Sequence, residues 1–438
     1  MEEDKKPIII EKKKKKKING YKFGRRSLMT LTLGIMFGGI AAVTFTLLQP
    51  VFSGIISPEP ESKPGVVTLK TDENEMSPEE MLSDYMQQQA LLEESNYEAV
   101  EVPLTEEQIG SILARVSLDR NNYRQIYSAL GDYIREMGRC IVTIDVIKSD
   151  EDWLSPVSDS RQTSGLIVAE NGVELLILAD GSQLREDAEL KTSILGGESI
   201  PVTIKEKDPS TGLVILAAAL NTLPDTVRKD PPIAVLGSSS YVVAGAPVIA
   251  LGSPLGNAGS IGYGMINSPR SVVSLDDSQM YLVQTDIGGG NAASGAIFNL
   301  SGQVIGIIVD TKTAGGRDGL VCGYGISELR ERIERMANGE NIGYLGITGT
   351  DVTTDAHNQQ GIPYGAYVKS VDINSPAMLS GIQTGDIIVR FGNREIINYT
   401  DYAEALLRSG QAEEIEIRLL RASQGEYKSI TVTTTVGE

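Results

Sequence analysis

Short apolar runs separated by turn-forming residues fill the chain between residues 140 and 309. CIVTIDVI, VELLILA and GLVILAAA are typical: each is long enough for one strand and is bounded by Gly, Pro, Asn or Asp. Many strands at this spacing predict an all-β barrel or sandwich assembly of about 190 residues. SELRERIERMANG then predicts a helix that stops at Gly339, so we expect this domain to span 140–338.

A smaller unit follows over 341–436, where strands and helices are mixed. YLGIT, GAYVKSV, DIIVRFG, EIEIRLLRA and YKSITVTTT predict strands. SPAMLSG and TDYAEALLRSG predict two short helices between them. The pattern therefore indicates a mainly β protein with an α+β domain after the larger β domain.

The N-terminal part has a different pattern. A basic segment over 1–26 precedes an apolar stretch over 27–52, which is long enough to cross a bilayer. Lysines before this stretch predict a single span in the cell membrane, with the N-terminus in the cytoplasm and the body outside. A cleaved signal peptide is the alternative, but without an evident small-residue cleavage site an uncleaved anchor is favoured.

Two segments connect the predicted span to the β domain. Residues 53–104 are rich in Pro, Ser and acidic side chains and predict a solvated stalk. Residues 105–139 carry apolar side chains at three- and four-residue spacing and predict a helical segment. This segment is expected to pack on the next domain or to self-associate, which leaves a homo-oligomer open.

Charge is divided unevenly along the chain. The net charge is −19 overall, but residues 1–26 carry +7 and the remainder carries −26. Since an acidic body repels nucleic acid, DNA and RNA are not expected partners. Cys140 and Cys322 lie in the exported body, where a disulfide and two buried free thiols are both open. CxxC motifs and clustered histidines are absent from the sequence, so no metal or cofactor is expected.

TDIGGGNAASGAIF places a lone serine, Ser294, among small residues just before an apolar strand. A tight turn of this kind can present a nucleophilic hydroxyl, but the hydroxyl needs a base that takes its proton. The chain has one histidine, His357, in a polar stretch of the C-terminal unit. We interpret His357 as a surface residue without a catalytic part.

The β domain contains five ordered segments: SGLIVAENG, DPSTGLVIL, LGSPLG, the segment around Ser294, and VIGII. Together they resemble the HtrA/Deg family, in which a membrane-tethered, trypsin-like double β-barrel is followed by a PDZ domain. The resemblance assigns Ser294 to the nucleophile position. It also implies a PDZ domain that binds extended or C-terminal peptides of exported proteins, a part in protein quality control, and oligomers.

The chain departs from the family at three positions. The catalytic histidine falls on or within a residue of Ala179, and the orienting aspartate falls on Gly212. The glycine that shapes the oxyanion hole falls on Ala292, where a Cβ is expected to strain the backbone. Loss of triad members lowers turnover by about 10⁴–10⁶. The domain is therefore predicted to be an inactive protease.

Three groups are candidates for a substitute base. They are His357 donated in trans, a distant lysine such as Lys191 in a Ser–Lys dyad, and Asp180 beside the lost histidine position. A working serine endopeptidase with a nonstandard base is therefore the alternative function. The favoured interpretation is that Ser294 is kept because small residues fill a tight turn.

The C-terminal unit keeps its family motifs. GYLGITG resembles the carboxylate-binding loop of PDZ domains, in which backbone N–H groups receive a peptide C-terminus. The predicted peptide-binding residues are Tyr344, Leu345, Gly346 and Ile347. We expect this loop to bind an exported peptide or to be filled by the protein's own segments. The sequence thus predicts a membrane-anchored, HtrA-like pseudoprotease that works by binding.

Overall fold

The computed structural model describes residues 64–71, 120–147, 160–185, 188–290, 292–309 and 319–437. The predicted basic tail and membrane span lie outside these residues, as does most of the predicted stalk. Within the described part of the chain, no helix is both long and apolar enough to cross a membrane. The membrane anchor stays a prediction.

The first β-domain is a seven-stranded antiparallel sheet. Its strands are β1 Ile141–Ile147, β2 Ser160–Glu170, β3 Glu174–Asp180, β4 Glu189–Ser193, β5 Ser199–Pro201, β6 Thr203–Lys207 and β7 Leu213–Ala219, in the order β5-β4-β1-β2-β3-β7-β6. In β1 every second side chain is buried, because successive side chains point to opposite faces. β3 and β7 pair with each other and are buried on both faces, which matches their continuous apolar runs.

The second β-domain is a closed barrel. Its strands are β8 Pro247–Ser253, β9 Ser260–Leu275, β10 Ser278–Gly288, β11 Ser294–Phe298, β12 Val304–Ile308 and β13 Leu320–Gly325, in the order β10-β13-β12-β11-β8-β9. β9 and β10 form a long hairpin in which Leu275 pairs with Ser278. The turn of this hairpin therefore consists of Asp276 and Asp277.

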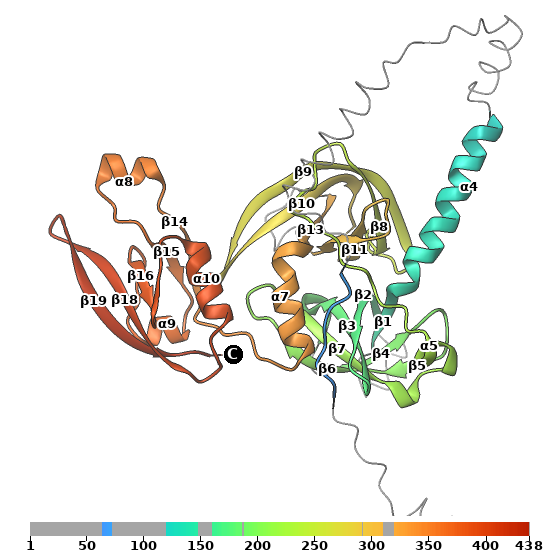
Figure 1. Ribbon diagram of the computed structural model, residues 1–438, viewed down its shortest axis with the longest axis horizontal. Helices are drawn as coiled ribbons and strands as arrows, with labels where there is room; N and C mark the ends of the chain where they lie inside the picture. The colour runs from blue at the N-terminus through green and yellow to red at the C-terminus, as the bar shows by residue number, and fades with distance from the viewer. Residues whose placement is uncertain are drawn as a thin grey trace, which may run out of the picture. The chain divides into compact units, whose positions relative to one another are not determined.

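Helices and short 3₁₀ turns lie between the strands along the chain of these β-domains (Figure 1). They are α4 Arg120–Met137, the 3₁₀ turns η1 Gly138–Cys140, η2 Gly181–Gln183 and η3 Leu220–Thr222, α5 Asp225–Lys229 and α7 Ile326–Ala337. The apolar face of α7 is buried in the same cluster as residues of both β-domains. The helix expected over 105–139 is described from Arg120 onward.

Residues 64–71 correct the expectation of a solvated stalk. Val67 and Leu69 are buried in the cluster shared by the two β-domains. Leu236 N–H donates to the carbonyl oxygen of Lys70, and Asn338 accepts a hydrogen bond from Val67 N–H at 2.7 Å. Alternating apolar residues in VVTLK allow this short extended segment to bury one face, a signal masked by the acidic and Pro-rich composition around it.

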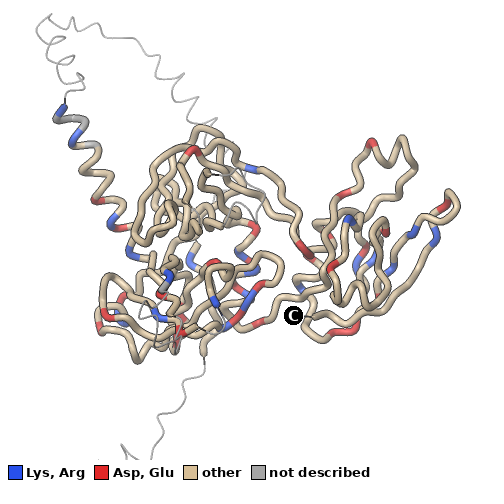
Figure 2. Tube along the Cα trace, turned by 180° about the vertical axis from the view of Figure 1, so that it is seen from behind, with Lys and Arg blue, Asp and Glu red and all other residues tan. Residues whose placement is uncertain are grey.

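The C-terminal unit is a five-stranded antiparallel sheet with a short extra strand and three helices. Its elements are β14 Ile347–Asp351, α8 Thr354–Gln360, β15 Ala366–Val371, α9 Pro376–Leu379, β16 Ile387–Phe391, β17 Arg394–Glu395, α10 Tyr399–Leu407, β18 Glu414–Ser423 and β19 Glu426–Thr435. The order β14-β15-β16-β18-β19 leaves β14 at one edge. Basic and acidic residues are interspersed along the traced chain of this unit and of the β-domains (Figure 2). The mainly β fold with a mixed C-terminal unit is confirmed.

Candidate functional site

Ser294 is the first residue of β11 and lies in a very close contact between strands. It pairs with Ser253 of β8. The next residue, Gly295, has φ of 113°, and a Cβ on it would lie 2.1 Å from the carbonyl oxygen of Leu251. Only glycine tolerates this conformation and this approach. Glycine at position 295 is therefore required by packing.

The Ser294 hydroxyl is enclosed and acts as an acceptor. The residue is 0% exposed. Thr163 Oγ1 and the backbone N–H of Ser164, both in β2, donate to Ser294 Oγ at 3.0 Å each. A nucleophilic serine must instead donate its proton to a base. Neither partner is a base, so the geometry is that of a structural hydroxyl.

Ala179 and Gly212, at which the sequence analysis predicts loss of the catalytic histidine and aspartate, also have structural surroundings. Ala179 is buried in the apolar core of the first β-domain. Asp180 next to it accepts a hydrogen bond from Ser182 N–H at 2.9 Å and caps η2. Gly212 has φ of 73°, and its carbonyl oxygen accepts the N–H of Gly181 at 2.9 Å. The two segments thus meet through their backbones, where a catalytic pair would need two side chains between them.

The loop before Ser294 is folded onto its neighbours. Ala292 has φ of 60°, the left-handed conformation that costs a residue with a Cβ about 1 kcal/mol. Gly290 N–H donates to the carbonyl oxygen of Pro254 at 3.0 Å, and Gly289 N–H donates to that of Gly319 at 2.8 Å. These two donors are already used within the chain and are not directed at a substrate oxyanion.

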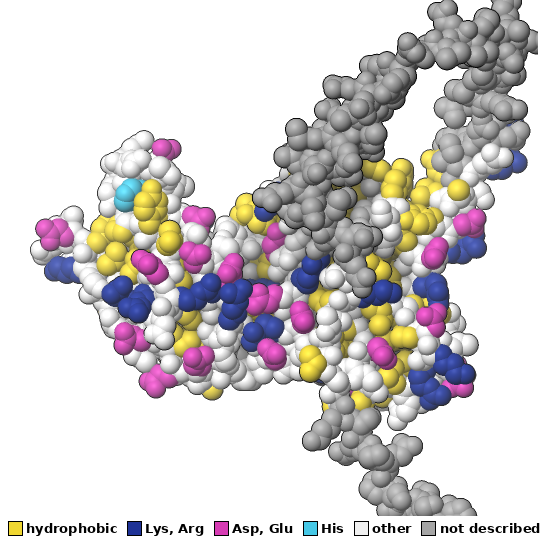
Figure 3. Space-filling view, viewed as in Figure 1, with side chains coloured by type: hydrophobic (Ala, Val, Ile, Leu, Met, Phe, Trp, Pro, Cys, Tyr) yellow, Lys and Arg dark blue, Asp and Glu magenta, His cyan; other side chains and the backbone are white. Residues whose placement is uncertain are grey.

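Two of the candidate substitute bases have their own partners elsewhere. The Lys191 ammonium lies 3.0 Å from Glu189 in β4. The ring of His357, in α8, stacks on Tyr364 at 4.1 Å, and its Nδ1 lies 2.8 Å from the carbonyl oxygen of Ile362. Figure 3 shows the histidine at the surface of the C-terminal unit, next to apolar side chains. Neither residue contacts the Ser294 hydroxyl.

Both cysteines are free and buried, so the alternative of two unpaired thiols applies. Burial raises the pKa of Cys140 to about 12, which keeps this thiol protonated and unreactive. Among the residues that the structure describes, no group of three or more His, Cys, Asp or Glu side chains is placed to hold a metal ion.

The predicted carboxylate-binding loop (residues 344–347, here the carboxylate loop) is occupied by a side chain of the same chain. The backbone N–H groups of Leu345 and Gly346 both donate to Asp277 Oδ2 at 2.6 Å, and that of Ile347 donates to Oδ1 at 3.0 Å. Gly346 has φ of 77°, and a Cβ on it would lie 2.5 Å from the Cβ of Ser375. A glycine is thus required for the three N–H groups to converge.

Tyr344, the remaining predicted peptide-binding residue, has a different role. Its backbone N–H and carbonyl pair with Gly437, and its hydroxyl donates to Asp372 at 2.7 Å. It therefore holds the start of the carboxylate loop against Gly437, beyond the end of β19, and it has no hydrogen bond to the Asp277 carboxylate.

Two tyrosines of α10 complete the site around the β9–β10 turn. Tyr402 donates its hydroxyl to Asp277 Oδ1 at 2.6 Å. The Tyr399 hydroxyl bonds to the carbonyl oxygens of Ile347 at 2.6 Å and Leu275 at 3.1 Å. Burial and the nearby Asp277 raise the pKa of both tyrosines well above the ordinary value, so both stay protonated donors.

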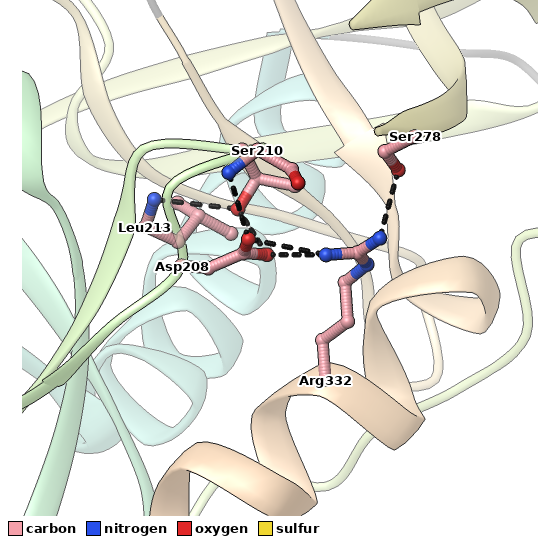
Figure 4. Close-up of polar contacts among 6 residues, drawn as sticks. Asp208, Ser210, Leu213, Ser278 and Arg332 are labelled. Atoms are coloured by element: carbon pink, nitrogen blue, oxygen red, sulfur yellow. Dashed lines mark hydrogen bonds and ion pairs between the residues drawn. The ribbon is translucent and has the colours of Figure 1, made fainter. Parts of the chain in front are cut away.

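A buried arginine also contacts the β9–β10 hairpin, at Ser278 (Figure 4). Arg332 of α7 lies 3.0 Å and 3.1 Å from the two carboxylate oxygens of Asp208 and donates to Ser278 Oγ at 3.0 Å. Its side chain is 4% exposed and that of Asp208 is 0% exposed. The residue directly after Asp277 is thus tied to the first β-domain through one guanidinium.

Sequence reasoning missed Asp277, Tyr402 and Arg332. One signal was available for Arg332, because it lies on the apolar face of α7 with Leu329 and Ile333 and is a charge at a buried position. The segment SLDDS predicts a turn, but its residue types do not indicate which part of the protein the turn contacts.

Comparisons with known families agree with this architecture. Residues 163–307 match the family described as a trypsin-like peptidase domain, and residues 367–421 match a PDZ domain. The fold and the site thus define a protein with a trypsin-like domain followed by a PDZ domain.

Similar proteins and solved structures indicate which group of trypsin-like, PDZ-containing proteins this chain resembles. The mitochondrial serine protease HTRA2 of Drosophila pseudoobscura pseudoobscura is 28% identical over 334 residues, which cover 70% of this chain and 75% of the relative. A probable periplasmic DegP-like serine endoprotease of Halomonas elongata is 26% identical over 285 residues, covering 63% of this chain and 57% of that relative. The solved structure of a variant of the HtrA-type protease AlgW with a tripeptide has a TM-score of 0.50 and 20% sequence identity to this chain. The match covers 70% of this chain and 96% of the AlgW chain, and it supports the fold alone. This chain is thus similar to HtrA proteases in both its trypsin-like domain and its PDZ domain.

Proposed function

We propose that this protein is an HtrA-like pseudoprotease: a single-pass membrane protein whose body faces outside and binds extended or C-terminal peptides of exported proteins through its PDZ domain. The observation that carries the proposal is the state of Ser294. Its hydroxyl is 0% exposed and accepts hydrogen bonds from Thr163 and Ser164. A peptide carbonyl has no access to this oxygen, and the oxygen has no base.

The absence of a catalytic histidine and aspartate determines how much peptide cleavage can remain. In a triad, the histidine takes the serine proton and the aspartate fixes the histidine tautomer. Here Ala179 and Gly212 stand at those positions. Loss of a working triad lowers turnover by about 10⁴–10⁶. The relatives named above are described as proteases, and this chain differs from that chemistry at the residues that perform it.

Peptide binding is supported by a different set of residues. The N–H groups of Leu345, Gly346 and Ile347 converge on one carboxylate, which is the arrangement that captures a peptide C-terminus. β14 lies at the edge of its sheet, where a peptide can add as a further strand. A part in quality control of exported proteins follows from capture of exposed chain ends.

The proposal is tested by casein cleavage. The full chain, purified in mild detergent, is incubated with unfolded casein beside its S294A variant, with trypsin as the positive control. We expect casein fragments to appear no faster with the wild type than with S294A. Fragments that form with the wild type and disappear with S294A would show that the domain is an active protease.

A further inference from the structure

The turn of the β9–β10 hairpin lies where a PDZ ligand lies, between β14 and α10. Asp276 forms an antiparallel bridge with Thr348 of β14. Asp277 N–H donates to the carbonyl oxygen of Ile347 at 2.7 Å. From the other side, Tyr402 of α10 donates to the Asp277 carboxylate. The turn thus makes both the backbone pairing and the end-group contact of a bound peptide.

The carboxylate of Asp277 is bound as a C-terminal carboxylate would be. It receives three converging backbone N–H groups and one hydroxyl, and the residue is 1% exposed. Hydrogen bonds to an ionised acceptor are shorter and stronger than neutral ones, and the two at 2.6 Å match that class. The position of Asp277 is chemically equivalent to the end of a peptide.

The backbone of the turn is shaped for this contact. Asp277 has φ of 56°, in the left-handed region that aspartate tolerates better than most side chains. The next residue, Ser278, is held by the buried Arg332. The hairpin therefore presents its carboxylate from a supported position and does not reach the loop as a free side chain.

We propose that Asp277 is an internal ligand of the carboxylate loop, and that a peptide with a free C-terminal carboxylate binds this PDZ domain only by displacing the β9–β10 turn. This inference rests on the proposed peptide-binding function and adds its regulation. Because the competitor belongs to the same chain, its effective concentration is on the order of millimolar. The apparent affinity for peptide is reduced by the fraction of molecules in which the loop is open.

The test variants and their control can all be made in the β9–β10 turn. D277G removes the carboxylate and suits the left-handed backbone, while D277N keeps the side-chain shape and removes the charge. D276N is the control, because it removes the same charge from the neighbouring position. The Asp276 carboxylate accepts its hydrogen bond from the Thr348 hydroxyl and does not contact the carboxylate loop. All are made in the full chain.

Two readouts separate this inference from the proposed function. The first is hydrogen exchange of the Leu345, Gly346 and Ile347 amides without any ligand. The second is binding of a random decapeptide pool with free C-terminal carboxylates, compared with the same pool as C-terminal amides. We expect D277G to exchange these amides about tenfold faster or more and to bind the carboxylate pool about tenfold more tightly. D277N should move in the same direction, and D276N should match the wild type.

Each outcome decides one claim. Faster exchange in D277G with no binding of either pool supports the internal ligand and contradicts peptide capture as the function. Equal binding of the carboxylate pool by wild type and D277G, with equal exchange, overturns the internal ligand and leaves peptide capture in place. The same effects in D276N as in D277G would assign them to loss of acidic charge and overturn the proposal.

Discussion

Two donor groups converge on the oxygen of Ser294, and four converge on the carboxylate of Asp277. In both cases the neighbours determine what the side chain can do. Thr163 and Ser164 both donate to Ser294, and neither is a base that could take its proton. Asp277 is desolvated, and its four donors offset part of the cost of burying its charge, so the buried carboxylate serves as a binding group.

The pH dependence of stability tests the environment of Asp277. Burial raises the pKa of Asp277 to about 6 from 3.8, against the lowering effect of the Tyr402 hydroxyl and the carboxylate-loop N–H groups. A carboxyl with a raised folded-state pKa contributes stability that is fully present below pH 3.8 and is lost as pH rises through about 6. From pH 5 to pH 7 we expect the wild type to lose about 1 kcal/mol of unfolding free energy relative to D277N.

Urea unfolding of wild type and D277N in parallel at both pH values measures this difference, because other titrating groups are common to the two proteins. A difference that stays constant or grows with pH would show that the folded-state pKa of Asp277 is not raised.

At the scale of elements, helix α7 connects the two β-domains and the hairpin through Arg332. A buried ion pair is weak evidence for net stability, but removal of one partner leaves the other charge buried and unpaired. We expect R332M to lose about 3–5 kcal/mol of unfolding free energy, because Asp208 then has no cation beside it. The control R408A breaks the half-exposed pair with Glu331 and is expected to cost at most about 1 kcal/mol.

Denaturant unfolding of the two variants makes this comparison. We also expect R332M to exchange the carboxylate-loop amides faster, because Ser278 loses its anchor. Equal stability of R332M and R408A would contradict the role assigned to the buried arginine.

Most elements could be predicted from the sequence, and the occupant of the carboxylate loop could not. Apolar runs and turn residues are local signals, so they located the strands of both β-domains and of the PDZ domain. The motif around Ser294 can be recognised from neighbouring residues alone. The same holds for Ala179 and Gly212, which differ from the HtrA/Deg motifs. The contact between Asp277 and Gly346 joins residues 69 positions apart and depends on how two domains pack. No period or motif encodes such a contact.

At the scale of the whole molecule, the predicted span over 27–52 should retain the protein in the membrane. We expect the full chain to sediment with membranes and to stay there after alkaline carbonate washing, since about twenty apolar residues suffice to span a bilayer. A variant that lacks residues 1–52 should not be retained. Intact mass of the membrane-bound protein checks the anchor, and a mass that corresponds to loss of the N-terminal segment would show a cleaved signal peptide instead.

Our main proposal is that this chain, which is similar to HtrA proteases, binds peptides without cutting them. Intact-mass measurement after exposure of the full chain to a fluorophosphonate tests it most directly, because the probe forms a covalent bond only with an activated serine. We predict no added mass on the wild type under conditions that label trypsin completely. A single adduct that appears on the wild type and is absent from S294A would contradict the claim.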